Sequence, residues 1–223
     1  MSVQVQEFDA TTDEAIERIG ALRARVYEDD EHFVPPFEAA LQRDLRRPQF
    51  AGRQRAFVAR RLGEDVACAV VRRSQTLSLD GKSVATIGNF DALEDDEAVV
   101  ALLQRAAKWA QDQGSQEVLG PMDGDTWHKY RFSLGPFDER PYFMEPYNPS
   151  YYPELWEQAG FEVVQTYHSR CVGDLDGALR HHRPRWASAR ALGYRVVPMT
   201  DPPFEEVLDR VYEMVCTIFA DGF

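Results

Sequence analysis

The sequence predicts an α/β fold in which a mixed, mostly antiparallel sheet is flanked by helices. Three observations lead to this prediction. Strand-like runs separated by short turns follow one another over 55–93, a strongly amphipathic helical pattern follows over 96–113, and helix and strand patterns alternate again as far as residue 172. Such alternation is typical of a sheet covered by helices on both faces.

The N-terminal part contains one strand pattern and two helix patterns. "VQVQEF" alternates apolar and polar residues, as a half-buried strand does. Next, Ile16, Ile19, Leu22 and Val26 recur at helical spacing, and the residues at 11–13 are good N-caps. "HFVPPFEAALQRDLR" predicts an extended turn and then a short helix, because the first turn of a helix tolerates proline.

The central part predicts an antiparallel meander. "RAFVARRL", "DVACAVVRRSQTLSL" and "KSVATIGNFDAL" are separated by turn residues at 63–65 and 80–81. We expect the 96–113 helix to pack on one face of the sheet and "EVLGPM" to add a strand. After a long aromatic loop, "YYPELWEQAG" predicts a helix and "FEVVQTYHSRCV" a last strand whose apolar residues are core, which gives about six or seven strands.

The C-terminal segment repeats the pattern of the N-terminus. "EAIERI" at 14–19 corresponds to "EVLDRV" at 206–211. We therefore divide the chain into a domain at 1–172, a partly helical linker at 173–193 and the truncated beginning of a second, similar unit at 194–223. On this interpretation the chain holds the first half of a two-half protein and the start of the second half.

Composition limits the class of partner. A net charge of −12 and a pI near 4.9 argue against a phosphate-binding surface, so we expect no nucleic acid and no membrane as partner. The three cysteines are far apart and lack metal-ligand spacing, so neither a disulfide framework nor a metal site is predicted. No apolar run reaches the ~20 residues of a membrane span, and "MSVQVQEFDA" lacks the features of a signal peptide, which predicts a cytoplasmic protein.

Several motifs resemble one enzyme superfamily. "LWEQAGFEVV" is similar to the C-terminal motif of the GNAT acyltransferases, in which a helix contributes an aromatic side chain to the acyl-CoA groove. "HFVPP", "GPMDGDTWHKYR", "EPYNPSYYPELWEQAGF" and "YHS" resemble a two-half subgroup of mostly unassigned substrate, over about residues 1–172. The resemblance implies a GNAT-like fold, an acetyl-CoA groove and the transfer of an acetyl group to an unidentified small-molecule amine.

The chain departs from the family where the CoA diphosphate would bind. In the family, a Q/R-x-x-G-x-G/A loop before the long helix holds the diphosphate with backbone N–H groups. Here Glu94, Glu97 and Val99 stand at those positions, both glycines are missing, and five carboxylates surround the helix start. The acids cap the helix and repel a diphosphate, which argues against acetyl-CoA binding in this half. Alternatively, they attract a cationic amine, or phosphate binds elsewhere.

The resemblance places the pantetheine arm of acetyl-CoA along a predicted strand and the helix that follows the loop. The implied cofactor-binding residues are Ile87, Gly88, Asn89, Phe90, Asp91, Asn148 and Trp156. Many family members have a tyrosine that protonates the leaving thiolate, whereas this chain has Trp156, whose indole is no useful proton source. Tyr152 and Tyr147 are the alternatives for that catalytic role. Packing inside the domain is the competing interpretation of Trp156.

The loop at 120–149 is where we expect the acceptor to bind. A loop of this length is typically functional or disordered, and this one is too aromatic for disorder. His128 is the candidate general base, because imidazole titrates near neutral pH. The substrate-binding candidates are Asp123, Trp127, Tyr130, Arg131 and Glu145. The alternative is a covering loop whose rings pack on the sheet and whose Arg131 pairs with Glu145.

Three functional hypotheses follow. The first is an acyl-CoA-dependent N-acyltransferase with a degenerate diphosphate loop. The second is a ligand-binding domain of the same fold without catalysis. The third is an interdomain or dimerisation module, with a second GNAT-like half or another copy of the chain as its partner.

Overall fold

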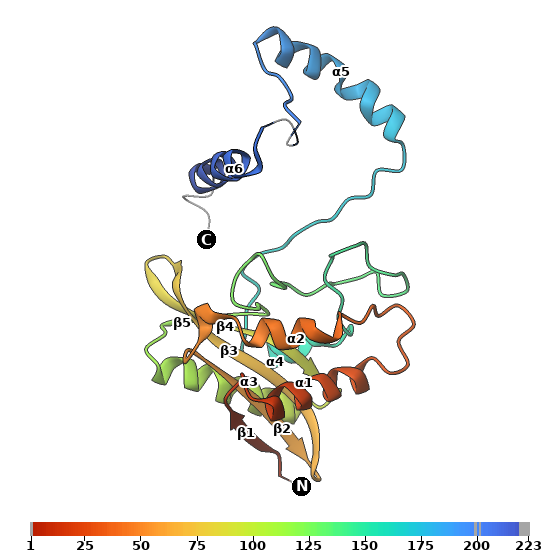
Figure 1. The fold of residues 1–223 in the computed structure, drawn as a ribbon. Helices are drawn as coiled ribbons and strands as arrows, with labels where there is room; N and C mark the ends of the chain where they lie inside the picture. The colour runs from red at the N-terminus through yellow and green to blue at the C-terminus, as the bar shows by residue number, and fades with distance from the viewer. Residues whose placement is uncertain (1, 199, 201, 219–223) are drawn as a thin grey trace. The chain divides into compact units, whose positions relative to one another are not determined.

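The computed structural model describes residues 2–198, 200 and 202–218. The chain divides into two compact units, Met1–Glu162 and Val163–Phe223, and each is described by itself (Figure 1). The predicted functional residues all lie in the first unit.

The first unit is built on a five-stranded sheet with the strand order β1-β2-β3-β4-β5. Its strands are β1 (Gln4–Phe8), β2 (Gln54–Arg61), β3 (Glu64–Leu79), β4 (Lys82–Ala92) and β5 (Glu117–Leu119). The first four pair in antiparallel fashion, and β5 joins β4 in parallel. The predicted mixed, mostly antiparallel sheet is therefore confirmed, and so is the meander at its centre.

Helices cover both faces of this sheet. On one face lie α1 (Asp13–Val26) and α2 (Glu38–Leu45), which is followed by the short helix η1 (Pro48–Phe50), and on the other lie α3 (Asp96–Asp112) and α4 (Tyr152–Gln158) (Figure 1). Because successive residues of a strand point to opposite faces, Ala56 and Val58 of β2 pack toward α1, whereas Phe57 and Ala59 pack toward α3. Two separate cores result.

A β-bulge interrupts β4 near its C-terminal end. Cys68 of β3 pairs with Asp91 and Val70 pairs with Gly88, so that Asn89 and Phe90 together face a single residue of β3. Asn89 has a φ of +43°, in the left-handed region that asparagine tolerates better than most residues. The bulge directs the Asn89 side chain to α2 and the Phe90 ring to α4.

The prediction of a last strand over 161–172 is wrong. No strand occurs over 161–172, and the Val163 and Val164 side chains, expected in the core, are 73% and 71% exposed. A strand forms only where a neighbouring strand supplies hydrogen-bond partners, and none of the five strands of the described sheet pairs with this run. The strand at 117–122 also ends early, at Leu119, so the described sheet has five strands instead of six or seven.

The second unit contains two helices, α5 (Leu175–Ala191) and α6 (Phe204–Ile218). α5 lies in the segment predicted as a partly helical linker. The interpretation of 194–223 as the start of a second GNAT-like unit stays a prediction, and residues 199, 201 and 219–223 of it lie outside the described part. None of the described helices combines the length and the apolar character that a membrane span requires.

Candidate functional site

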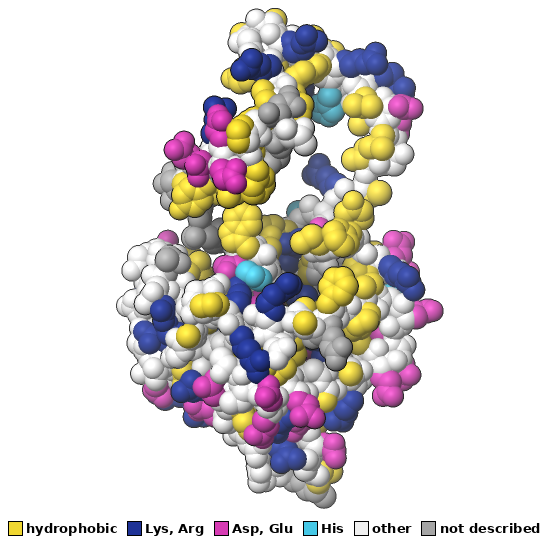
Figure 2. Space-filling model, viewed as in Figure 1, with side chains coloured by type: hydrophobic (Ala, Val, Ile, Leu, Met, Phe, Trp, Pro, Cys, Tyr) yellow, Lys and Arg dark blue, Asp and Glu magenta, His cyan; other side chains and the backbone are white. Residues whose placement is uncertain are grey.

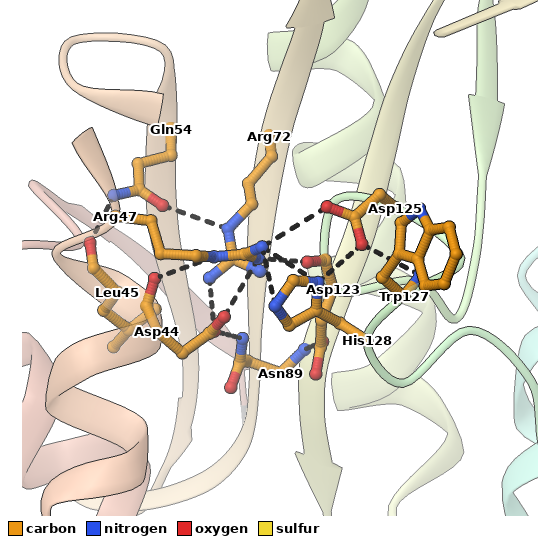
Figure 3. A network of polar contacts seen from close by, with 10 residues as sticks. All are labelled: Asp44, Leu45, Arg47, Gln54, Arg72, Asn89, Asp123, Asp125, Trp127 and His128. Atoms are coloured by element: carbon orange, nitrogen blue, oxygen red, sulfur yellow. Dashed lines mark hydrogen bonds and ion pairs between the residues drawn. The ribbon is translucent and has the colours of Figure 1, made fainter. Parts of the chain in front are cut away.

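A network of charged side chains surrounds the bulge of β4 (Figure 3). Arg72 of β3 is 0% exposed and donates to Asp44 Oδ2 (2.6 Å) and to the side chain of Gln54 (3.1 Å). Asn89 donates from its amide to the same Asp44 oxygen at 2.8 Å. Burial alone would raise the pKa of Asp44, but the charge of Arg72 and these hydrogen bonds outweigh it, so the pKa is lowered and the carboxylate is ionised.

The same network fastens the loop after β5 to the sheet. Arg47 donates to the main-chain oxygen of Asp123, and its guanidinium lies 3.4 Å from the Asp125 carboxylate. The Asp123 carboxylate accepts the N–H of Asn89 at 2.5 Å. Two predicted residues, Asn89 and Asp123, are thus brought together, but they bind each other.

His128 lies at the exposed edge of this network. Its Nδ1 is 2.5 Å from Asp125 Oδ1, and because a carboxylate only accepts, Nδ1 carries the proton in this contact. Arg47 Nη1 lies 3.0 Å from Nδ1 and 3.1 Å from Nε2 of His128. Because the two distances are nearly equal, this guanidinium nitrogen lies over the face of the imidazole ring. The imidazole is therefore oriented by a carboxylate and covered by a guanidinium. The neighbouring Trp127 indole is 78% exposed.

The main chain of β4 and its continuation is already hydrogen-bonded within the domain. The Ile87 carbonyl accepts the Met122 N–H at 2.7 Å, and the Asn89 carbonyl accepts the Cys68 thiol at 3.7 Å. The Ala92 N–H donates to the Tyr152 hydroxyl, and the Ala92 carbonyl accepts the Tyr151 hydroxyl, both at 2.8 Å. These are backbone groups at or beside the positions to which the resemblance assigned the pantetheine arm.

Asp91 forms a buried ion pair. Its carboxylate, 4% exposed, accepts the Arg23 Nε at 2.8 Å, and the Arg23 side chain is 15% exposed. Burial raises the pKa of Asp91, and the charge and hydrogen bond of Arg23 oppose that rise. Asp91 is thus a core residue.

Phe90, Tyr152 and Trp156 belong to an aromatic core cluster. Their rings lie edge to face at centroid distances of 4.8 Å (Phe90–Tyr152) and 5.4 Å (Phe90–Trp156). Tyr152 is 1% exposed and Trp156 3% exposed. Burial raises the pKa of Tyr152 well above its ordinary value, and its hydroxyl is engaged with Ala92. The structure places both side chains in packing positions, which favours the competing interpretation of Trp156.

The N-terminal end of α3 is capped and ion-paired by side chains of the domain itself. Asp95 caps the helix by accepting the Ala98 N–H at 3.1 Å, and Arg61 donates to both Asp95 oxygens (2.6 Å and 2.8 Å) and to Glu97 (2.9 Å). The hydrogen bonds from Arg61 are the main cause of the lowered pKa of Asp95. Four carboxylates over 94–97 and no glycine surround this helix end. These residues do not fit a CoA diphosphate.

Tyr147 lies in a different place, an acidic cleft of about 550 Å³ at the C-terminal end of α1. Its hydroxyl donates to the two oxygens of Asp30 at distances of 2.8 Å and 2.7 Å. Partial burial, followed by the contact with Asp30, raises the pKa of Tyr147 to about 12, so the phenol is protonated at neutral pH. Four consecutive acids, Glu28, Asp29, Asp30 and Glu31, line the cleft.

The aromatic residues that line the cleft are Phe137, Tyr147 and Tyr151, and two further rings outside the lining pack beside Tyr147. Tyr27 and Phe33 stack at a centroid distance of 3.8 Å, and the Tyr147 ring lies 6.3 Å from Tyr27 and 6.4 Å from Phe33. Carboxylates beside electron-rich rings bind an ammonium group through charge and cation–π attraction.

The remaining loop candidates hold the loop together. The buried Asn148 side chain accepts the Ser133 N–H at 2.7 Å, and Arg131 pairs with Glu145 at 3.0 Å while lying over the Tyr130 ring at 4.7 Å. Figure 2 shows hydrophobic side chains gathered on part of the first unit's surface, and the exposed residues Tyr142, Phe143 and Met144 belong to this loop. The Arg131–Glu145 pair matches the covering-loop alternative, although other rings of the loop face solvent.

A larger cleft, of about 650 Å³, lies between α1 and the β2–β3 turn. Its charges satisfy one another, because Arg18 pairs with both oxygens of Asp65 (2.8 Å and 2.7 Å) and Arg60 pairs with Asp65 at 3.0 Å. It offers a ligand fewer free groups than the acidic cleft does.

Sequence reasoning missed the residues that organise both places. Arg47, Arg72 and Asp44 organise the network at the bulge, and Asp30 organises the acidic cleft. The acidic run "YEDDEH" directly after the α1 helix was the available signal for the cleft.

Comparisons with known proteins give structural neighbours only. No family model and no curated protein matches the chain. Among solved structures, it is similar to the aminoglycoside acetyltransferase meta-AAC0020 from an uncultured soil metagenomic sample, with 14% identity and a TM-score of 0.45, over 76% of this chain and 97% of that chain. It is also similar to AAC(6')-Iy in complex with a bisubstrate analogue containing CoA (14%, TM-score 0.47, 77% and 100%).

A third similar structure has a different title, a transcriptional regulator from Bacillus halodurans C-125 (16% identity, TM-score 0.46, 77% of this chain and 100% of that chain). At these identities and TM-scores, the similarities assign neither a substrate nor a catalytic residue to this chain.

Proposed function

We propose that residues 1–162 form a GNAT-like domain that binds the cationic amine acceptor of an N-acyltransferase reaction. The observation that supports this most directly is the acidic cleft, which is lined by four carboxylates, by the Phe137 and Tyr151 rings and by the Tyr147 phenol, which donates to Asp30. An ammonium group gains Coulomb attraction there, and the half-exposed position of Asp30 keeps the cost of desolvation low.

The role of Tyr147 in this proposal is to orient the Asp30 carboxylate. A phenol with a pKa of about 12 donates a hydrogen bond at neutral pH and does not act as a base. Holding both oxygens toward one hydroxyl limits the rotation of the carboxylate, so that less entropy is lost when an amine binds. His128, the candidate base from the sequence, is not among the residues that line the acidic cleft, so the proposal gives it no role in binding the amine.

The test uses nuclear magnetic resonance on the isotope-labelled chain with cadaverine, a diamine, and pentane-1,5-diol, its neutral analogue. We expect cadaverine to shift the amide signals of 28–32 and of Tyr147, and the diol to leave them unchanged. Shifts confined to other segments, or equal shifts with both compounds, would refute the proposal.

A second candidate function is that of an interdomain or dimerisation module. It is supported by α6, where the side chains of Leu208, Tyr212, Met214 and Ile218 are 52–69% exposed. Exposed apolar side chains along one helix favour contact with another protein surface. Light scattering over a range of chain concentrations distinguishes it, because a dimerisation module gives a mass that rises with concentration.

A further inference from the structure

We infer that the first unit is closed to an acyl-CoA donor at both places where the GNAT resemblance puts the donor, and that its own residues take the positions of the ligand. The inference concerns α3 and β4 and not the acidic cleft, and taken together with the amine proposal it means that the acyl donor is bound outside residues 1–162.

At the start of α3, the Asp95 carboxylate stands where a phosphate would accept helix N–H groups. It already accepts the Ala98 N–H, and Arg61, the cation next to this helix end, spends its hydrogen bonds on Asp95 and Glu97. A diphosphate at this helix end would be repelled by the carboxylates, and Arg61 is already paired with them and does not attract it. The Asp95 carboxylate, paired with Arg61, thus occupies the position in which a bound anion would accept hydrogen bonds from the helix.

Along β4, hydrogen-bonding groups and space are both taken. The Asn89 N–H is bound by the Asp123 carboxylate and the Ile87 carbonyl by the Met122 N–H. Even a methyl group placed on the Cα of Gly88 would overlap the Asp123 carboxylate and the Met122 carbonyl, and one placed on Gly120 would overlap the Trp156 indole. A pantetheine arm needs free main-chain partners and an open edge, whereas the Ile87 carbonyl, the Asn89 N–H and the space beside Gly88 are already occupied.

The occupied positions at α3 and at β4 differ in how deeply they are buried. The side chains at α3 lie near the surface, with Asp95 17% and Glu97 68% exposed, so substitution opens this site without disturbing the core. The closure at β4 is part of the packed interior. The cluster of Arg61, Asp95 and Glu97 at α3 is therefore the place to test the inference by design.

The experiment compares the native chain with a variant carrying Asp95→Asn and Glu97→Gln. Asparagine keeps the N-cap, so helix α3 stays formed, and circular dichroism checks this. The probe is inorganic pyrophosphate, titrated by calorimetry at low and at high salt. Glu157→Gln, at an exposed acid of α4, is the matched control.

We expect no measurable pyrophosphate binding to the native chain or the control. The double variant should bind pyrophosphate with an affinity at least about tenfold above the detection limit set by the control, and this affinity should fall as salt is added. We also expect acetyl-CoA to leave hydrogen exchange of α3 and β4 in the native chain unchanged. Protection of either segment by acetyl-CoA, or a folded double variant that binds pyrophosphate no better than the control, would overturn the inference. Amine binding is not measured, so these results leave the proposed function to its own test.

Discussion

Replacing Arg23 by methionine tests whether the β4 end is core instead of a ligand edge. The change removes the guanidinium, keeps a long apolar side chain, and leaves the Asp91 carboxylate, 4% exposed, without its partner at 2.8 Å. Breaking a buried ion pair from one side costs about 3–5 kcal/mol. Against a typical domain stability of roughly 5–15 kcal/mol, this loss is large.

The assay is urea unfolding followed by tryptophan fluorescence, at several pH values. The pKa of Asp91 is raised by burial, so the folded state binds its proton more tightly than the unfolded chain does. The penalty of Arg23→Met is therefore full at neutral pH and shrinks as the pH falls through the raised pKa of Asp91 in the variant. The double variant Arg23→Met with Asp91→Asn recovers most of the lost stability, because no charge is left unpaired.

A cost of Arg23→Met below about 1 kcal/mol at neutral pH, the size of an exposed ion pair, would contradict a core position of Asp91. A cost that does not depend on pH would contradict it as well. Either result would mean that water reaches Asp91, as it would at an open groove.

Three further predictions follow from the structure. Tyr147→Phe removes the hydroxyl that donates to Asp30, so we expect the amine affinity measured by calorimetry to fall about fivefold. The free energy of unfolding in urea should change by no more than about 1 kcal/mol, the contribution of a single hydrogen bond. Trp156→Ala leaves a cavity beside Phe90, and chemical unfolding should show a loss of about 3–5 kcal/mol; a loss below about 1 kcal/mol would contradict its core position. Arg61 lowers the pKa of Asp95, so the ion pair stabilises the fold above about pH 4, and this stabilisation is lost as the pH falls through the lowered pKa. The melting temperature of Asp95→Asn should therefore lack this decrease at acid pH.

Local patterns were sufficient to predict most of the fold. The turns at 63–65 and 80–81 defined the three antiparallel strands, and the helical spacing of apolar residues defined α3 as Asp96–Asp112. These features depend on residues close together in the sequence. The last strand at 161–172 failed because a strand needs a partner strand, and no local pattern states whether one is available.

The candidate site was harder to predict because its contacts join distant parts of the chain. Asp91 was assigned to a cofactor because of its strand, but its partner Arg23 lies 68 residues away. Tyr147 was predicted as a site residue; the structure places it at a cleft, where its partner Asp30 is 117 residues distant in the sequence, and its functional role stays a prediction. The missing glycines at the start of α3, in contrast, were visible in the sequence, and the structure adds Arg61 as the cation that completes the cluster.

The amine proposal is tested most directly by calorimetric titration of cadaverine into the native chain, into Asp30→Asn and into Asp112→Asn, an acid outside the cleft. At low ionic strength we predict binding to the native chain and to Asp112→Asn with equal affinity, a loss of about tenfold in Asp30→Asn, and weaker binding of every chain as salt is added. Equal affinity of all three chains, or no heat of binding to the native chain, would contradict the assignment of the acidic cleft as the amine site.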